Sequence, residues 1–306
     1  MKKYLFFLCA CFLFLAGAGC EKVIEFTGEQ TESRLTLSSQ AEVGEPLEAY
    51  IASSVFFLSA SPYGTSFVEG LDARQGQVRC YVNGETTPRL LAYVPKEDAT
   101  SLHYILSDYA PAPGDHIRLE AEFPGFEPVW AETDVPLAPA FEIVSVNPGT
   151  SGGVELTLAL TDDASYDNFY FLQPLIQTWE SSMDQHVFWT LSFSSNDVLF
   201  HEMSGTSALE TFDDEAGNYF SDDLIKGQRH VFVITVPYWQ NESMHLWIHG
   251  AAINESLYWY GISYDLLTSM DEWTSFFSEG VTLYSNVHGG YGVFGAAASQ
   301  WLKVEW

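Results

Sequence analysis

Apolar and polar residues alternate along most of the first half of this chain, as they do in the strands of a half-buried sheet. The clearest run places Ile117, Leu119, Ala121 and Phe123 at every second position, between turn sequences rich in Pro and Gly. Similar runs occupy 35–37, 47–51, 78–82, 102–106 and 129–135. About seven short strands in about 100 residues predict an immunoglobulin-like β-sandwich over residues 34–137.

The second half, residues 141–306, has a similar pattern and predicts a mostly-β domain after a linker rich in Ala and Pro. Apolar residues alternate at 154–160 and again at 187–193. The run 231–236 is apolar at five of its six positions, which is typical of a strand buried on both faces. We therefore predict a mainly β protein with two domains.

One segment of the second half has helical spacing instead. Apolar residues recur there at intervals of three and four, at Leu257, Tyr260, Tyr264, Leu267 and Met270. Asn254, just before them, is a residue type that caps helix N-termini. The spacing predicts one helix over about 255–274.

The N-terminus has the pattern of a bacterial export signal. Lys2 and Lys3 precede an apolar run at 4–15, and small residues at 16–19 precede Cys20. This order predicts a signal peptide over residues 1–19. The cysteine after the small residues resembles a lipobox, which implies that Cys20 becomes the acylated, palmitate-bearing first residue of a lipoprotein. Residues 20–33 are then a short polar tether.

Composition supports a folded and strongly acidic protein. The chain has 306 residues, of which 47% are hydrophobic and 15% aromatic, so it can build a sizeable core. It has 41 Asp and Glu residues against 12 Lys and Arg, a formal net charge of −29. Such a charge repels phosphate backbones, so we exclude nucleic acid as a partner.

The cysteines do not predict a disulfide. Cys9 and Cys11 lie in the signal peptide and Cys20 is the lipidation site, which leaves only Cys80. Cys80 alternates with two valines, so we predict that it points into the core as a small hydrophobe.

Motifs with catalytic potential lack their structural context. Gly149 to Gly153 match the G-x-S-x-G elbow around Ser151, but a strand-like segment follows where the motif needs a helix. His245 and His249 lie four apart in a strand-like segment without the Glu of a zinc-binding helix. We therefore predict no catalytic residue, no cofactor and a non-enzymatic protein.

Acidic clusters leave two alternatives open. They lie at 162–163 with Asp167, at 213–215 and at 222–223, all in predicted loops. Solvated loops are the simplest interpretation, and Ca²⁺ binding is the alternative. A pair of these carboxylates could also act as the acid and base of a glycan hydrolase.

Tryptophans gather in the second half of the chain, with Trp130 the exception among nine. Core packing explains a single tryptophan, but this density also suits a sugar- or peptide-binding face or a protein interface. The eight are Trp179, Trp189, Trp239, Trp247, Trp259, Trp273, Trp301 and Trp306.

Several segments, taken in order, resemble one family. They are EKVIE after Cys20, APAPGDHIRLEAEF, VWAETDVP, the acidic segment 221–223, the aromatic helix, and SNVHGGYGVFG at 285–295. They resemble, over residues 20–300, the Bacteroidota lipoproteins grouped as domain of unknown function 4249. Members of that family are often encoded beside TonB-dependent outer-membrane receptors, so the resemblance implies the outer membrane as location and such a receptor as partner.

The glycines of SNVHGGYGVFG favour a structural role. Four glycines among residues 289–295 permit positive φ and close backbone approach. No Lys-Ser/Thr pair follows them, so they do not predict phosphate binding.

We therefore predict a lipoprotein that is anchored in one leaflet of the outer membrane, without predicting which leaflet. It binds a small molecule, glycan or peptide and acts as the partner of a TonB-dependent receptor in nutrient uptake. The first alternative is a surface glycan or peptide hydrolase that uses carboxylates of residues 141–306. The second alternative is an adhesion or assembly module.

Overall fold

The computed structural model describes ten stretches of the chain. They are residues 32–54, 67–68, 70–96, 100–149, 153–180, 184–200, 210–212, 218–238, 244–269 and 282–305. Residues 33–306 form one compact unit. The signal peptide, Cys20 and nearly all of the predicted tether lie outside the described residues, so these three expectations stay predictions.

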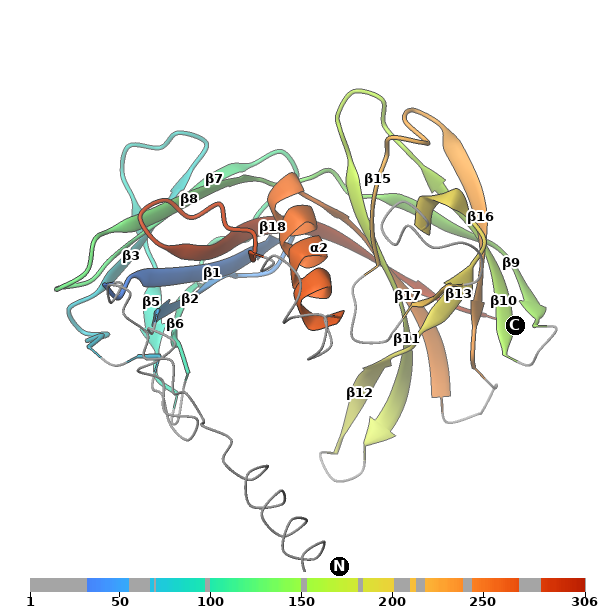
Figure 1. Ribbon diagram of the computed structural model, residues 1–306, viewed down its shortest axis with the longest axis horizontal. Coiled ribbons are helices and arrows are strands. Elements are labelled where there is room, and N and C mark those ends of the chain that lie inside the picture. The colour runs from blue at the N-terminus through green and yellow to red at the C-terminus, as the bar shows by residue number, and fades with distance from the viewer. Residues whose placement is uncertain are drawn as a thin grey trace, which may run out of the picture. The chain divides into compact units, whose positions relative to one another are not determined.

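The first half of the chain folds as a sandwich of two sheets (Figure 1). Strands β1, β2, β6 and β5 form one layer, and β4, β3, β7 and β8 form the other. Apolar residues of both layers share one core, which includes Leu37, Ile51, Leu119 and Ala131. The strands are β1 (Leu35–Glu42), β2 (Leu47–Ser53), β3 (Gln77–Val82), β4 (Arg89–Leu90), β5 (Ala92–Val94), β6 (Leu102–Leu106), β7 (His116–Glu122) and β8 (Val129–Asp134).

The prediction of a mainly β, sandwich-like fold is thus confirmed, because the period-two alternation matches the burial of these strands. In β7, for example, Ile117, Leu119 and Ala121 are buried and the residues between them are not. Cys80 is fully buried in the same core, and burial raises the pKa of its thiol to about 12. The thiol is therefore protonated at neutral pH and acts as a small apolar group.

The second half adds a further pair of layers. A five-stranded sheet, in the order β14-β13-β16-β10-β9, packs against β11, β15 and β17. Leu158, Phe232, Leu172 and Ile248 meet in the core between them. The elements are β9 (Ala140–Pro148), β10 (Val154–Thr161), β11 (Phe169–Glu180), β12 (Gln185–Thr190), β13 (Phe193–Ser195), η1 (Val198–Phe200), β14 (Glu210–Phe212), β15 (Asn218–Ser221), β16 (Arg229–Val236), β17 (Met244–Ile253), α2 (Glu255–Ser269) and β18 (Tyr291–Lys303).

The last strand, β18, joins the two halves of the sequence. It pairs with β17 in antiparallel and with β1 in parallel, so one sheet runs in the order β12-β11-β17-β18-β1-β2-β6-β5. Phe294 and Ala296 of β18 are buried in the core of the first sandwich. Two stretches of sequence that we predict as separate domains thus share one sheet.

Two strand expectations in the second half are wrong in detail. The alternating run 187–193 is not one strand, because β12 pairs with β11 whereas β13 belongs to the five-stranded sheet. The apolar run 231–236 is not buried on both faces. Val231 and Val233 are 45% and 42% exposed, because no element among the described residues covers that side of β16.

Helix α2 begins where the sequence predicts. Asn254 Oδ1 accepts hydrogen bonds from the backbone N–H groups of Leu257, at 3.2 Å, and Ala296, at 3.0 Å. The N-cap thus also holds the helix to β18. Tyr258 packs with Ala251 and Ala297 of the sheet below. Residues 270–274 of the predicted helix lie outside the described residues.

Membrane-spanning segments are lacking among the helices of the described residues, since none of them combines the necessary length and apolarity.

Close backbone approach explains the glycines of SNVHGGYGVFG. A side-chain carbon at Gly290 would lie 2.2 Å from Leu35 O, and one at Gly292 would lie 2.1 Å from Leu37 O. Gly292 also has a φ of +114°, which L-residues rarely adopt. The predicted structural role is confirmed, because β18 can pair with β1 only if these positions have no side chain.

We predict that Gly292→Ala lowers the free energy of unfolding by more than about 2 kcal/mol, since it adds a backbone clash to an unfavourable φ. Gly114→Ala is the matched control: Gly114 has a φ of +85° but no atom within 4 Å of an added side chain. It should cost only about 1 kcal/mol. Urea unfolding of both variants measures the difference, and equal costs would contradict the close-approach explanation.

Candidate functional site

Some of the predicted site residues lie outside the described part of the chain. They are Ser151 of the G-x-S-x-G segment, the acidic cluster 213–215 and the lipidation site Cys20. The remaining acidic clusters and both histidines of the 245–249 pair are described, and they lie in two different places.

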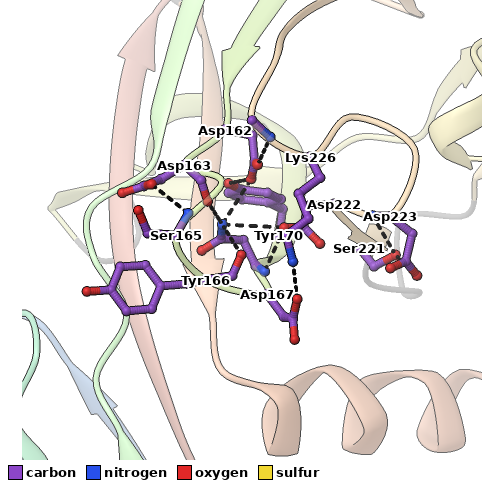
Figure 2. A network of polar contacts seen from close by, with 12 residues as sticks. Asp162, Asp163, Ser165, Tyr166, Asp167, Tyr170, Ser221, Asp222, Asp223 and Lys226 are labelled. Atoms are coloured by element: carbon purple, nitrogen blue, oxygen red, sulfur yellow. Dashed lines mark hydrogen bonds and ion pairs between the residues drawn. The ribbon is translucent and has the colours of Figure 1, made fainter.

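Two of the acidic clusters meet in one buried network (Figure 2). Asp162 follows β10 and Asp222 follows β15, and the two side chains are only 6% and 2% exposed. Asn168 lies between them: its Nδ2 donates to Asp162 Oδ1 at 3.0 Å, and its backbone N–H donates to Asp222 Oδ2 at 3.0 Å. Through these hydrogen bonds Asn168 joins two segments of the chain, around Asp162 and Asp222, that lie about 60 residues apart in the sequence.

Both oxygens of Asp162 are used within the network. Oδ1 also accepts a hydrogen bond from the Tyr170 hydroxyl at 2.7 Å, and Oδ2 accepts one from the Gly227 N–H at 2.6 Å. Nearby, Lys226 forms an ion pair with Asp167. We name Asp162, Asn168, Tyr170, Asp222 and Gly227 the aspartate latch, because their bonds hold the 162–168 loop to the 221–228 turn.

The latch has the properties of a structural element. Burial raises the pKa of Asp222, and the bond from the Asn168 N–H opposes this shift. No group of three His, Cys, Asp or Glu side chains in the described stretches is placed to hold a metal ion. A glycosidase pair must flank a space for its substrate, whereas Asp162 and Asp222 are buried and share Asn168. The Ca²⁺ alternative stays a prediction.

His249 lies in an aromatic environment on β17. Its ring stacks on Trp301 with 4.3 Å between centroids and 11° between planes, and Phe171 lies at 5.5 Å. Its Nε2 is 2.9 Å from Ser299 Oγ. Burial lowers the pKa of His249 to about 4, so the ring is neutral at pH 7. His245 is exposed on the same strand, and among the described residues the two histidines belong to no group of three or more His, Cys, Asp or Glu side chains that could hold a metal ion.

Trp301 and His249 belong to one face of the sheet that contains β18, which has nine strands because β15 also pairs with β11. The register of β11, β12, β17 and β18 places alternate residues on the face opposite the Leu158–Ile248 core. Helix α2 covers the part of this face around Ala251, Ile253 and Ala297. We name the uncovered part the aromatic face; its residues include Gln177, Trp179, His186, Phe188, His245, Trp247, His249 and Trp301.

The rings of this face contact one another across strands that are not neighbours. The ring centroid of Phe188 on β12 lies 5.4 Å from that of Trp301 on β18 and 6.3 Å from that of Trp247. These contacts form although β11 and β17 lie between β12 and β18 in the sheet. Trp179 and His186 form a second pair at 5.0 Å. Even so, Trp179, Phe188 and Trp301 are 50%, 44% and 46% exposed. Exposed apolar surface of this kind is typical of interaction sites, so this face is a candidate binding surface.

The aromatic face is nearly uncharged. No carboxylate occupies its outward positions on β11, β12, β17 or the 297–303 part of β18, in a chain with 41 acidic residues. Lys303 is the one lysine or arginine at these outward strand positions. Glu42 lies at the border of the face, and its Oε1 accepts a hydrogen bond from the Ser299 N–H at 3.0 Å. Polar groups are present nevertheless, since Trp247 Nε1 donates to Gln177 Oε1 at 3.1 Å.

An apolar groove lies beside α2. It is an open groove of about 640 Å³, lined by residues that include Trp259, Ile262, Leu266, Leu283 and Tyr291. Trp259 is 44% exposed there, as exposed as Phe188 on the aromatic face. It therefore provides a matched comparison for tests of that face.

The sequence shows that aromatic residues are abundant in the second half, but it does not show that they share this face. The alternating run at 187–193 contains Val187 and Trp189, which point to the other side of β12, so it does not predict a role for Phe188. The available signal was the aromatic residue at each of 186, 188 and 189, together with tryptophans at 247 and 301. Which of them meet depends on strand order.

Comparison with known proteins gives one family. The family profile described as "Domain of unknown function (DUF4249)" matches residues 21–301. Among curated proteins, none matches this sequence.

We predict that Asp162→Ala lowers the free energy of unfolding by about 2–4 kcal/mol, because it leaves the Tyr170 hydroxyl and the Gly227 N–H without their acceptor. Asp163→Ala is the control. The Asp163 carboxylate accepts its bond from the Ser165 N–H at an exposed position, so its loss should cost below about 1 kcal/mol. Urea unfolding compares them, and a cost of Asp162→Ala no larger than that of Asp163→Ala would refute the latch.

We predict that the protein loses stability, on the order of 2 kcal/mol, as pH falls from 6.5 to about 4. In this window the unfolded chain protonates His249 and the folded protein does not, so the proton favours unfolding. His249→Gln should flatten the slope, whereas exposed His245→Gln should leave it unchanged. Urea midpoints measured every half pH unit test this, and an unaltered slope in His249→Gln would show the cause to be elsewhere.

Proposed function

This chain belongs to the DUF4249 family, and on that premise we propose that it is a non-enzymatic lipoprotein of the outer membrane, anchored through Cys20, that binds a nutrient ligand on its aromatic face beside a TonB-dependent receptor. The observation that carries the ligand-binding role is the exposure of Trp179, Phe188 and Trp301 on one nearly uncharged face. The anchor and the receptor rest on the signal-like N-terminus and on the family resemblance.

Energetic considerations support a role for this exposure. The three large aromatic side chains are about half exposed. Each Å² of apolar surface that stays in water costs the protein roughly 25 cal/mol of the free energy that burial would supply. A partner or ligand that covers them gains that free energy on binding. Aromatic residues in such positions are the usual energetic centres of interfaces.

The carboxylates support the binding role over the hydrolase alternative. Asp162 and Asp222, which belong to the predicted acidic clusters, are buried within the latch and bonded to Asn168. Catalysis of glycan hydrolysis needs an acid and a base on opposite sides of a substrate. The aromatic face itself carries no carboxylate at its outward strand positions.

We predict that the tagged full-length protein, purified from solubilised outer membranes, brings with it a TonB-dependent receptor and a bound small molecule detectable by mass spectrometry. Trp301→Ala should lose the small molecule and keep the receptor, because the aromatic face binds the ligand. Trp259→Ala, equally exposed but on α2, should keep both. In a separate arm, Cys20→Ala should move the protein from the membrane to the soluble fraction.

A preparation of the unaltered protein that contains neither a receptor nor a bound molecule would count against this function. Loss of the molecule in Trp259→Ala but not in Trp301→Ala would move the site to the groove beside α2.

A further inference from the structure

We propose that the aromatic face takes a neutral glycan chain, whose sugar rings pack on Trp301, Phe188 and Trp179. This inference rests on the proposed function and assigns the chemical class of its ligand. Three properties of the face carry it: the chemistry of its rings, their extent along the strands, and the distribution of charge.

The rings have the chemistry that sugar rings require. Aromatic faces carry negative charge density, whereas the C–H bonds of a sugar ring present a weakly positive apolar surface. The stack on His249, with 11° between the planes, fixes the indole of Trp301 before any ligand arrives. Phe188 is fixed in turn by its contacts with Trp301 and Trp247. A surface held in place in this way loses little side-chain freedom on binding.

The face is longer than a single ring. Trp179 lies two residues along β11 from Gln177, a rise of roughly 7 Å along the strand. The Trp179–His186 pair therefore extends the aromatic surface beyond the cluster of Phe188, Trp247 and Trp301. An extended row of apolar surfaces suits a chain of sugar units better than one small molecule.

Polar groups accompany the rings, as hydroxyl-rich ligands need. Gln177 Oε1 accepts the Trp247 N–H, and its amide Nε2 makes no hydrogen bond to the described residues. His249 uses Nε2 toward Ser299 Oγ, and its Nδ1 likewise lacks a hydrogen bond within the described stretches. These groups can donate to or accept from hydroxyl groups without carrying charge.

Charge selects a neutral ligand over an acidic one. A net charge of −29 repels polyanions at long range, while the face itself is free of carboxylates at its outward positions. Lys303 alone adds a positive charge there. A peptide that binds by adding a strand is less suited, because it would pair with a strand edge such as that of β12, whereas Trp301 and Phe188 lie on the face of the sheet.

Native affinity electrophoresis tests the inference with the full-length protein in a polyoxyethylene detergent, which has no sugar headgroup to compete. The gels contain neutral β-glucan, galactomannan or xylan, or acidic polygalacturonate, and the protein migrates readily because of its charge. We expect at least one neutral polysaccharide to retard it. Trp301→Ala and Phe188→Ala should each weaken the association about tenfold or more.

Matched variants separate ring stacking from loss of fold. Trp301→Phe keeps an aromatic ring and should recover part of the affinity, whereas Trp259→Ala should change it less than twofold. Phe188→Ala, at an exposed position, serves as the second variant if Trp301→Ala unfolds. Circular dichroism verifies the fold of each.

Several outcomes would overturn the inference. They are no retardation by any neutral polysaccharide, stronger retardation by polygalacturonate, or binding to phosphatidylethanolamine–phosphatidylglycerol vesicles that depends on Trp301. If mass spectrometry still finds a non-sugar molecule that Trp301→Ala releases, the ligand class is wrong and the proposed function stands. If neither a glycan nor any other molecule depends on Trp301, both fail.

Discussion

The structure depends on the parallel pairing of β18 with β1. The two strands come from opposite ends of the chain, and their pairing requires the backbone of Gly290 and Gly292 to approach Leu35 and Leu37 too closely for any side chain. This pairing joins β11, β12 and β17 to the first sandwich in one sheet. It also places Phe294 and Ala296 in the core of that sandwich.

The same strand connects the fold to the candidate site. Its first half packs in the sandwich core, and its second half carries Ser299 and Trp301 next to His249. The N-cap of α2, Asn254, is bonded to β18 at Ala296, so the helix is fixed over one part of the sheet face. The aromatic face is what the helix leaves uncovered. Its position is therefore a consequence of how β18 is held.

Acidic residues have two distinct roles in this protein. Among the described residues most contribute to the surface charge, whereas Asp162 and Asp222 are buried and join two loops through Asn168. The aromatic face lacks carboxylates at its outward strand positions, and burial keeps His249 neutral. A strongly acidic chain thus presents one nearly neutral surface, which is the physical basis for the ligand class that we propose.

Features that depend on neighbours in the chain can be predicted from the sequence: the alternating strands such as β7, the inward position of Cys80, and the Asn254 cap with the start of α2. The sequence also indicated that the glycines at 289–295 were structural. The split of the run 187–193, the exposure of Val231 and the contact of Phe188 with Trp301 depend instead on how the strands are arranged in space. The physical reason is that period-two alternation shows which residues of one strand share a face. It does not contain the order of the strands, and that order brings residues more than 100 positions apart into one surface.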